Sequence, residues 1–376
     1  MDDHFVLDEK NAKKSVKYNL EKIKNGIVYS VTNYLIILSL SIVGFKHIES
    51  FSASLFDSYV LSGLLFFFFL WILFYIVSLI FLIYSTFVTE KRFDFSNTTL
   101  TLFLVDQIKE TLLIFIFGGF ILTGLLWIIH NYDYWWIIVI IGSMAITLFI
   151  NWIYPLIIIP IFYKMKSIAD TNIGNKIKDI SEHAGFEVTG IFVIDYSKRS
   201  KHSNALIAGF GKSKRIILYD TLLEDFEDEE ILAIFAHEMG HYINHDILKS
   251  ILTTFSILSL SIVFIWYLIS SDIFVNTFDI RESYTELIYA FILSSTLINL
   301  ARGIINSYSR KREIKADRYS VECLNSVEPL KNALKKLYKI NLSNINPHPL
   351  YSKYYYSHPT PAERIEHIDA LKNDRG

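Results

Sequence analysis

The stretch Phe235-Ala236-His237-Glu238-Met239-Gly240-His241 contains the pattern HExxH. On a helix, residues four apart project from the same face, so the imidazoles of His237 and His241 can bind one zinc ion. Glu238 follows the first histidine and can act as a general base on a water molecule beside the metal. The pattern therefore predicts metal-dependent peptide hydrolysis, although so short a motif also arises by chance on amphipathic helices.

The chain around this motif has the composition of a membrane protein. Of its 376 residues, 52% are hydrophobic and 15% are aromatic, which is more than a soluble domain usually has. A bilayer crossing needs about 20 mostly apolar residues. Six blocks meet this requirement and predict six spans: 27–45, 59–88, 111–131, 134–159, 251–270 and 285–305. Pro155 lies inside the fourth block and Pro160 follows it, so we expect a kink or a stop there.

The composition also excludes some classes of function and of site. The formal net charge is −2, which gives no electrostatic basis for binding nucleic acid. The only cysteine, Cys323, cannot form an intramolecular disulfide, and a cysteine-rich zinc site is excluded as well.

Lysine and arginine alternate between rich and poor segments along the chain. Residues 1–26, 89–110, 160–250 and the C-terminal region are the richer segments, whereas the loops between them carry few basic residues. Basic segments next to spans remain in the cytoplasm. We therefore expect both termini and both long polar regions on the cytoplasmic side.

The predicted spans divide the chain into four parts. Residues 1–162 form an N-terminal membrane region with four spans, and residues 251–305 contain two more. Residues 163–250 and 306–376 are polar, and we expect them to form one compact catalytic domain that the last two spans interrupt.

Short apolar runs predict strands in the first of these polar parts. Residues 190–195, 204–209 and 215–219 are typical of short buried strands. The acidic run 224–230 suits the first turn of the HExxH helix. We expect that helix to extend to about Lys249 and into the fifth span.

A catalytic zinc site usually has three protein ligands. The pattern HExxHxxGxxH would need glycine at position 244 and histidine at position 247, but these positions hold Asn244 and Ile247. His245 would lie about 12 Å from His237 along a helix, so the two cannot share one ion. The third ligand must therefore come from another segment.

The segment 309–317 contains the better candidate. Glu313 and Asp317 lie one turn apart on a predicted helix. Glu313 can supply the third ligand, and Asp317 can orient a ligating histidine. A glutamate among basic residues is more commonly a solvated surface charge, so both interpretations of Glu313 are open on spacing alone.

Several longer runs make the chain resemble the type I CAAX prenyl proteases, which are integral-membrane zinc peptidases. The runs are HEMGHYINHD (237–246), SRKREIKAD (309–317), HSNA (202–205) with GFG (209–211), KRIILYDTL (214–222) and YYSHPTPAERI (355–365). Two shorter matches, EKRF (90–93) and Tyr154-Pro155 followed by Pro160, extend the resemblance over nearly the whole chain.

The resemblance implies a role for each matched residue. It implies one zinc ion per chain, with His237, His241 and Glu313 as its ligands. Glu238 would be the catalytic base, and His358 would donate a hydrogen bond to the oxyanion. Asp317 and Arg364 would support the site. Asn204 and Ala205 would lie on an edge strand that pairs with the substrate backbone. Without the family, His358 before a proline is more commonly a loop histidine, and Asn204 a turn or strand-end residue.

These observations predict a multi-pass α-helical membrane protein with a cytoplasmic zincin-like α+β catalytic domain and helices that enclose an intramembrane chamber. The predicted function is that of a zinc metalloendopeptidase. Its partners would be membrane lipid and a peptide or protein tail that is lipidated or membrane-associated. CAAX-type tail processing and quality control of membrane proteins are both open as its role. A non-enzymatic transporter or scaffold is the alternative, but it has no need of the ligand set.

The number of spans departs from the family pattern. Eukaryotic members have seven spans, whereas the sequence here predicts six. This difference favours a prokaryotic member, in a bacterial inner membrane rather than the endoplasmic reticulum.

Overall fold

Six long helices dominate the computed structural model, which describes residues 9–186 and 189–373. Within those ranges, six helices are long and apolar enough to cross a membrane: Asn11–Leu55, Tyr59–Arg92, Leu100–Asn131, Trp135–Phe162, Asp246–Ser270 and Ser283–Cys323. Each covers one predicted span to within one residue, which confirms the six spans. A helix satisfies its own backbone hydrogen bonds, as a chain in lipid must.

Each of the first four long helices contains a short π-helical segment between two α-helical parts. The α-helical parts are α1 (Glu9–Ser39) and α2 (Phe45–Leu55), α3 (Tyr59–Tyr84) and α4 (Glu90–Arg92), α5 (Leu100–Leu113) and α6 (Gly119–Asn131), and α7 (Trp135–Ile153) and α8 (Ile159–Phe162). Pro155 lies in the π-helical segment of the fourth long helix, which ends at Phe162, two residues after Pro160. The predicted stop is therefore confirmed, because proline removes a backbone donor that the helix needs.

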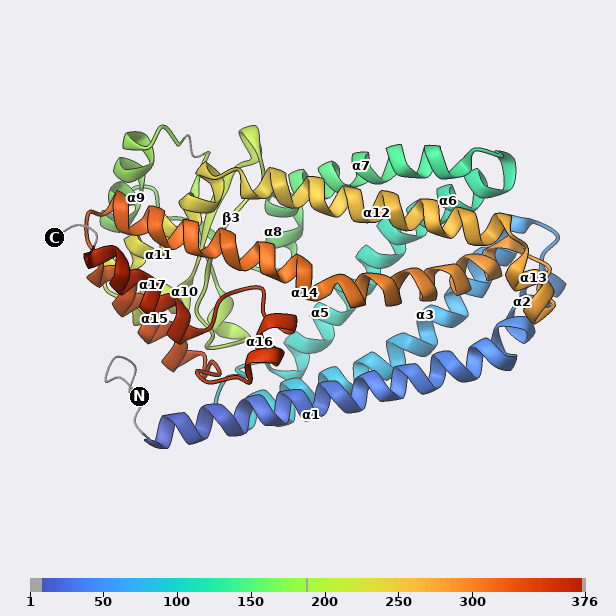
Figure 1. Ribbon diagram of the computed structural model, residues 1–376, viewed down its shortest axis with the longest axis horizontal. Helices are drawn as coiled ribbons and strands as arrows, with labels where there is room; N and C mark the ends of the chain where they lie inside the picture. The colour runs from blue at the N-terminus through green and yellow to red at the C-terminus, as the bar shows by residue number, and fades with distance from the viewer. Residues whose placement is uncertain (1–8, 187–188, 374–376) are drawn as a thin grey trace.

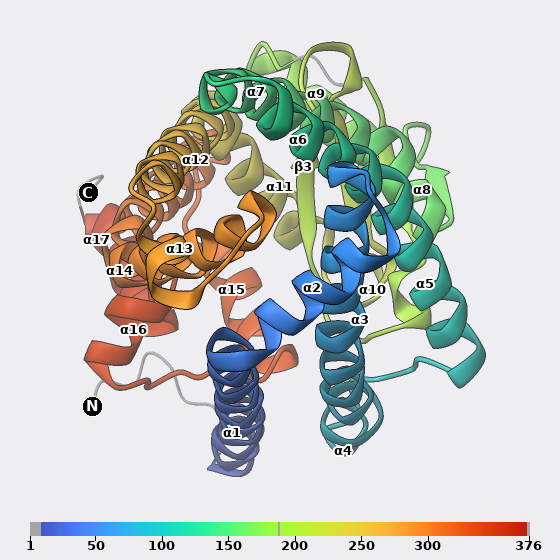
Figure 2. The ribbon, with the colours of Figure 1, turned by 90° about the vertical axis from the view of Figure 1, so that its right-hand side faces the viewer.

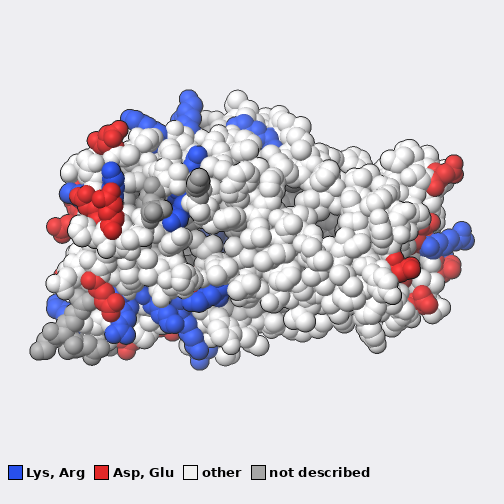
Figure 3. Space-filling view, turned by 90° about the horizontal axis from the view of Figure 1, so that it is seen from above, with Lys and Arg blue, Asp and Glu red and all other residues white. Residues whose placement is uncertain are grey.

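The long helices form a ring when the molecule is viewed along its longest axis (Figure 2). The charged side chains on the face shown in Figure 3 gather toward the two ends, and a broad uncharged band lies between them. Such a band is what a bilayer-spanning protein needs, because charged groups are costly in hydrocarbon. The start of α1 and the end of α17 (Pro361–Asn373) lie at the same end of the molecule as the sheet (Figure 1).

A four-stranded sheet organises that end, in the order β1-β2-β4-β3. The three predicted strands are confirmed as β2 (Ile191–Ile194), β3 (Ala205–Ala208) and β4 (Arg215–Tyr219), whereas β1 (Met165–Ser167) was not predicted. β4 pairs in parallel with β2 and antiparallel with β3. β3 is consequently an edge strand in the described part of the chain.

The helix that carries the HExxH pattern, α11 (Asp228–Ile243), begins at a capping box in which the Glu230 side chain accepts a hydrogen bond from the Glu227 amide at 3.0 Å. The prediction that this helix continues through Lys249 into the fifth span is wrong. His245 has a left-handed backbone with φ of 56°, and α12 (Asp246–Ser270) starts after it. An isolated left-handed residue interrupts the α-helical backbone.

The last long helix, α14 (Ser283–Cys323), continues well beyond its apolar span and joins the two polar parts of the chain. The remaining helices are α9 (Asn172–His183), α10 (Asp220–Asp225), α13 (Ile273–Phe278), α15 (Glu328–Ile340) and α16 (Pro349–Tyr355). One buried cluster contains Ala233 of α11, Val321 of α14, Leu330 of α15 and Ile368 of α17. Residues from before and after the last two spans therefore share one core.

Candidate metal centre

Close packing of α11 against α14 creates the site. A Cβ atom built on Gly240 would lie 3.0 Å from the Cα of Ala316, and Ala316 is completely buried. One helical turn further on, the Ser320 hydroxyl donates a hydrogen bond of 2.7 Å to the Ala233 carbonyl of α11. Because glycine and alanine face each other, the helices approach closely enough for side chains of α14 to reach the histidines of α11.

Three side chains converge as possible metal ligands. The Nε2 atoms of His237 and His241 lie 3.5 and 3.2 Å from the two carboxylate oxygens of Glu313. One ligand atom from each residue can be chosen such that all three lie within 4.8 Å of one another. The structure thus brings together the three residues that the sequence analysis named as ligands.

The chemistry of this donor set fits a metal ion. Glu313 is 5% exposed, and its Oε2 atom is buried without a hydrogen-bond partner. A buried carboxylate oxygen with no hydrogen bond is costly, and a cation would satisfy it. Two imidazole nitrogens and one carboxylate oxygen form a known set of protein ligands for a catalytic metal.

Asp317 and Arg364 fix the orientation of His237. The Asp317 carboxylate lies 2.8 Å from Nδ1 of His237, so it accepts that proton and leaves Nε2 directed at Glu313. Arg364 binds both oxygens of Asp317, through Nε at 2.8 Å and through Nη2. Both residues are buried, with 1% of Asp317 and 7% of Arg364 exposed. Burial alone lowers the pKa of His237, but its contacts with Asp317 and Glu313 outweigh burial and raise the pKa to about 9.

Asp246 fixes the orientation of His241 as Asp317 fixes that of His237, and this role was not predicted from the sequence. The Oδ2 atom of Asp246 lies 3.1 Å from Nδ1 of His241. Asp246 is the first residue of α12, and the left-handed backbone at His245 brings it back toward the preceding helix. Its only sequence signal is its place at the end of the HEMGHYINHD run. That match does not indicate a role for Asp246, because the residue pattern does not reveal the turn at His245 that positions this side chain.

Glu238 lies between the two histidines in sequence, on the same helix. Burial raises the pKa of its carboxyl group, whereas the neighbouring His237 and His241 act in the opposite direction. A raised pKa makes a carboxylate a stronger base, which suits a group that must remove a proton from water.

His358 reaches the site from the loop between α16 and α17. Its Nε2 atom lies 3.4 Å from an oxygen of Glu313, and its Nδ1 atom lies 3.0 Å from the Ser357 hydroxyl. The side chain of His358 is 62% exposed, in contrast to the buried groups behind it. The imidazole therefore stands at the open side of the centre, where a bound peptide would meet it.

The edge strand β3 begins directly after Asn204, so Ala205 lies on the strand and Asn204 lies just before it. The Asn204 carbonyl accepts a hydrogen bond from the Tyr219 amide of β4 at 3.1 Å, and the pairing places Ala205 opposite Leu218. In an antiparallel pair, hydrogen-bonded positions alternate. Residues 204, 206 and 208 therefore bond to β4, and residues 205 and 207 point their amides and carbonyls to the free edge.

One backbone group on this free edge, the Ala205 amide, is already hydrogen-bonded to the Asn204 side chain. Its Oδ1 atom accepts a hydrogen bond of 2.9 Å from the Ala205 amide. The Ala205 carbonyl and both backbone groups of Ile207 face the same free edge. An extended peptide could add to the sheet there by backbone hydrogen bonds.

Comparisons with known proteins identify the family of this chain. A family model described as "Peptidase family M48" matches residues 167–372. Another, described as "CAAX prenyl protease N-terminal, five membrane helices", matches residues 4–164. The CAAX prenyl protease 1 homolog of Arabidopsis thaliana is 36% identical over 309 residues, which are 78% of this chain and 70% of that protein. CAAX prenyl protease 1 of Saccharomyces cerevisiae is 33% identical over 314 residues, 78% of this chain and 68% of that protein.

The crystal structure of S. mikatae Ste24p has the same fold. It superimposes with a TM-score of 0.88 at 31% sequence identity, covering 96% of this chain and 90% of that chain. The predicted fold class is confirmed: a multi-pass helical membrane protein whose long helices surround a chamber, with a catalytic domain that contains a small sheet.

Proposed function

The chain belongs to peptidase family M48 and, within it, to the type I CAAX prenyl proteases, and from that premise we propose how its residues perform peptide hydrolysis. It is a membrane metalloprotease. We propose that its metal is zinc and that His237, His241 and Glu313 hold it. The observation that supports this assignment is the buried oxygen of Glu313, which has no hydrogen-bond partner and lies among two imidazoles. Zinc, when bound, supplies a Lewis acid that polarises the scissile carbonyl and acidifies water.

The side chains around the centre would move the protons and stabilise charge. Glu238 accepts a proton from the attacking water and passes it to the leaving amine nitrogen. His358 donates a hydrogen bond from Nε2 to the oxyanion of the tetrahedral intermediate. Asp317, with Arg364 behind it, and Asp246 keep the Nδ1 protons of the two histidines in place, so that both Nε2 atoms face the metal.

The substrate would lie along the free edge of β3 as an added strand. The Ala205 carbonyl and the amide and carbonyl of Ile207 supply the backbone hydrogen bonds, and Asn204 shapes the entry to this edge. Binding through the backbone places little demand on side chains, so sequence preference would be loose. An extended tail fits this edge better than a folded domain does.

The relatives are named CAAX prenyl proteases, and we carry that role over to this chain as a proposal. The substrate would be a lipidated C-terminal tail, cut on the cytoplasmic side, where the alternation of basic segments puts the sheet and both termini. The bacterial inner membrane stays a prediction that depends on the span count. A transporter or scaffold is not favoured, because neither needs two histidines and a glutamate at ligand distance.

Two variants and one pair of peptides test the proposal. Glu238→Gln should keep about one zinc per chain and lose at least 10²-fold of the cleavage rate, because the ligands remain and the base is gone. Glu313→Ala should lose both zinc and cleavage. Zinc content is measured on purified protein, and cleavage is followed on one peptide with and without a prenyl group. A Glu313→Ala protein that retains zinc like the wild type refutes the ligand set, and equal cleavage of the two peptides refutes the lipidated substrate.

A further inference from the structure

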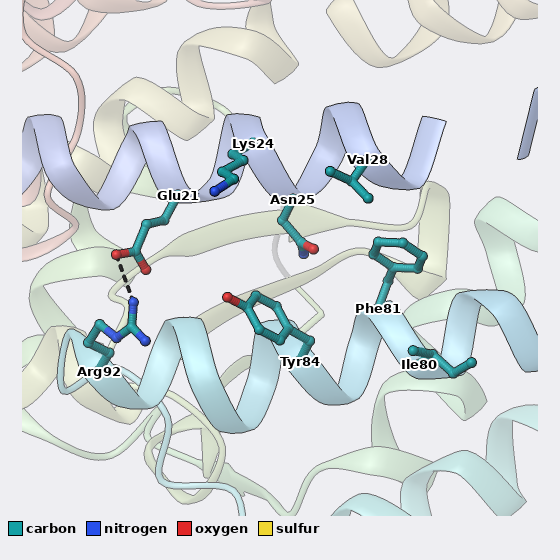
Figure 4. A pocket seen from close by; sticks show the side chains of 8 residues that line it. All are labelled: Glu21, Lys24, Asn25, Val28, Ile80, Phe81, Tyr84 and Arg92. Carbon is teal, nitrogen blue, oxygen red and sulfur yellow. Dashed lines mark hydrogen bonds and ion pairs between the residues drawn. The ribbon is translucent and has the colours of Figure 1, made fainter. Parts of the chain in front are cut away.

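A groove between α1 and α3 lies away from the metal centre and combines two kinds of lining (Figure 4). It has a volume of about 400 Å³. One end is polar and contains Lys24, Arg92 and Glu21, with the Asn25 amide and the Tyr84 hydroxyl beside them. The other end is apolar, with Val28 of α1 and Ile80 and Phe81 of α3.

The lining of the groove changes from polar to apolar near the ends of the two predicted apolar spans. The two predicted apolar spans that flank it start at residue 27 and end at residue 88. Lys24 and Arg92 lie just outside these limits, and Val28 and Ile80 lie inside them. At about 1.5 Å per helical residue, the groove extends roughly 18 Å along the long helix Tyr59–Arg92, from Arg92 of α4 to Ile80 of α3. One leaflet of a bilayer with its headgroups is about 20 Å thick, so the groove matches one lipid in length.

The charge of the polar end favours an anion. Arg92 forms an ion pair of 2.9 Å with Glu21, but it stays 50% exposed, and a guanidinium has five donors. Lys24 is exposed on the next turn of α1. Two cations and one carboxylate leave a net positive charge, and the exposed Lys22 and Lys91 add to the surrounding field.

We propose that this groove binds one anionic phospholipid from the leaflet on the side of the catalytic domain. Its phosphate lies between Lys24 and Arg92, and one acyl chain follows Val28, Phe81 and Ile80 into the bilayer. The apolar side chains at that end are well exposed to the surrounding membrane, with 48% of Val28 and 61% of Ile80 accessible. The Tyr84 hydroxyl and the Asn25 amide face the polar part of the lipid between these two ends.

The position of the groove connects this lipid to the catalytic domain. Two turns before Asn25 on α1, the Tyr18 hydroxyl donates a hydrogen bond of 2.7 Å to Glu90, and the other oxygen of Glu90 lies 3.3 Å from Nε2 of His202. His202 lies three residues before Ala205, the first residue of the edge strand β3. A lipid that holds α1 against α3 therefore stabilises the contacts that support β3.

Lipid binding by the purified full-length chain in detergent tests the proposal. The probes are phosphatidylglycerol and phosphatidylcholine with identical acyl chains, and retained lipid is counted by native mass spectrometry across a titration. The wild type should retain one phosphatidylglycerol in preference to phosphatidylcholine. Lys24→Ala should weaken this binding about fivefold, as expected for one cation at a membrane surface. Val28→Trp should abolish it without any change in charge, because indole fills the apolar end. Lys17→Ala, on the same helix but outside the groove, is the matched control and should bind like the wild type.

Three results would overturn the proposal. Equal retention of the two lipids would show that the phosphate end does not select an anion. An equal loss in Lys17→Ala and Lys24→Ala would show that the whole basic surface of α1 attracts lipid without a defined site. If Val28→Trp keeps phosphatidylglycerol but slows cleavage of a prenylated peptide only, the groove holds the lipid of the substrate. A wild-type zinc content and a single symmetric elution peak verify the fold of each variant.

Discussion

Asp317 and Asp246 hold the two histidines in the same way, yet their removal should have different consequences. Each accepts the Nδ1 proton of one histidine, at 2.8 Å and 3.1 Å respectively. Loss of such a partner typically weakens metal binding 10- to 100-fold, which corresponds to about 1.4–2.8 kcal/mol. We therefore expect Asp317→Asn and Asp246→Asn to weaken zinc binding to a similar degree.

The two variants should differ in the stability of the metal-free protein, because the cations beside the two aspartates differ in burial. Asp317 is the hydrogen-bonded partner of Arg364, which is only 7% exposed and whose next carboxylate, Glu313, lies 3.9 Å away; removing one partner of a buried ion pair costs about 3–5 kcal/mol. The cations near Asp246 are Lys249 at 3.4 Å and Arg312 at 3.9 Å, and Lys249 is 49% exposed. Lys249 can return to water and Arg312 keeps its hydrogen bond to the Ser250 hydroxyl, so removing the charge of Asp246 should cost at most about 1 kcal/mol.

Two measurements on purified protein separate these effects. Zinc affinity is obtained by competition with a chelating dye, and stability by thermal unfolding in excess chelator. Asp317→Asn should lower both zinc affinity and the melting temperature, whereas Asp246→Asn should lower zinc affinity with little change in melting. Asp279→Asn, which breaks an exposed ion pair with Lys46 near α13, is the control and should change neither. Unchanged zinc affinity in Asp246→Asn, or equal melting temperatures of the two metal-free variants, would refute the reasoning.

Three further predictions concern the oxyanion, the substrate edge and pH. His358→Ala should lower kcat by about 10²–10³ with little change in KM, and a wild-type kcat in steady-state kinetics would exclude an oxyanion role. Ile207→Pro removes an amide from the free edge of β3 and no bond to β4, so KM should rise for unrelated peptides alike, while Ile207→Val should behave like the wild type. In chelator, the stability that protonated His237 contributes is complete below about pH 6.5 and is lost as the pH rises through about 9. Melting temperatures in chelator should therefore fall over this window, and Asp317→Asn should flatten the fall; an upward trend in the wild type would contradict the sign.

The membrane spans are predicted well from the sequence because the thickness of the bilayer sets a minimum length for each apolar block. Each of the six apolar blocks lies within a long helix to within one residue, and the two longest helices are Asn11–Leu55 and Ser283–Cys323. Hydropathy locates where a chain enters lipid but not where its helix ends. The first helix accordingly begins at Glu9 and the last continues to Cys323, both far outside the apolar blocks. That continuation of α14 positions Glu313, and no hydropathy pattern reveals it.

The residues of the candidate site were predictable to different degrees. The spacing of His237 and His241 indicates a shared helical face directly, whereas the role of Glu313 followed from the family resemblance. Asp246 could not be predicted, because its position depends on one left-handed residue, His245, between two helical segments. β1 was missed because it has only three residues and is held by its pairing with β2, which is not a local property of its sequence.

The interruption of the catalytic domain by two spans has a consequence for synthesis. The ribosome makes His237 and His241 first, then α12 and most of α14, and only afterwards Glu313. Glu313 follows His241 by 72 positions, which take roughly 4 to 14 s to synthesise at typical rates of translation. His358 and Arg364 follow within the last 20 residues of the chain. A nascent chain therefore has no complete candidate centre until both final spans have been made, and cleavage that requires all of these residues would begin only after that point.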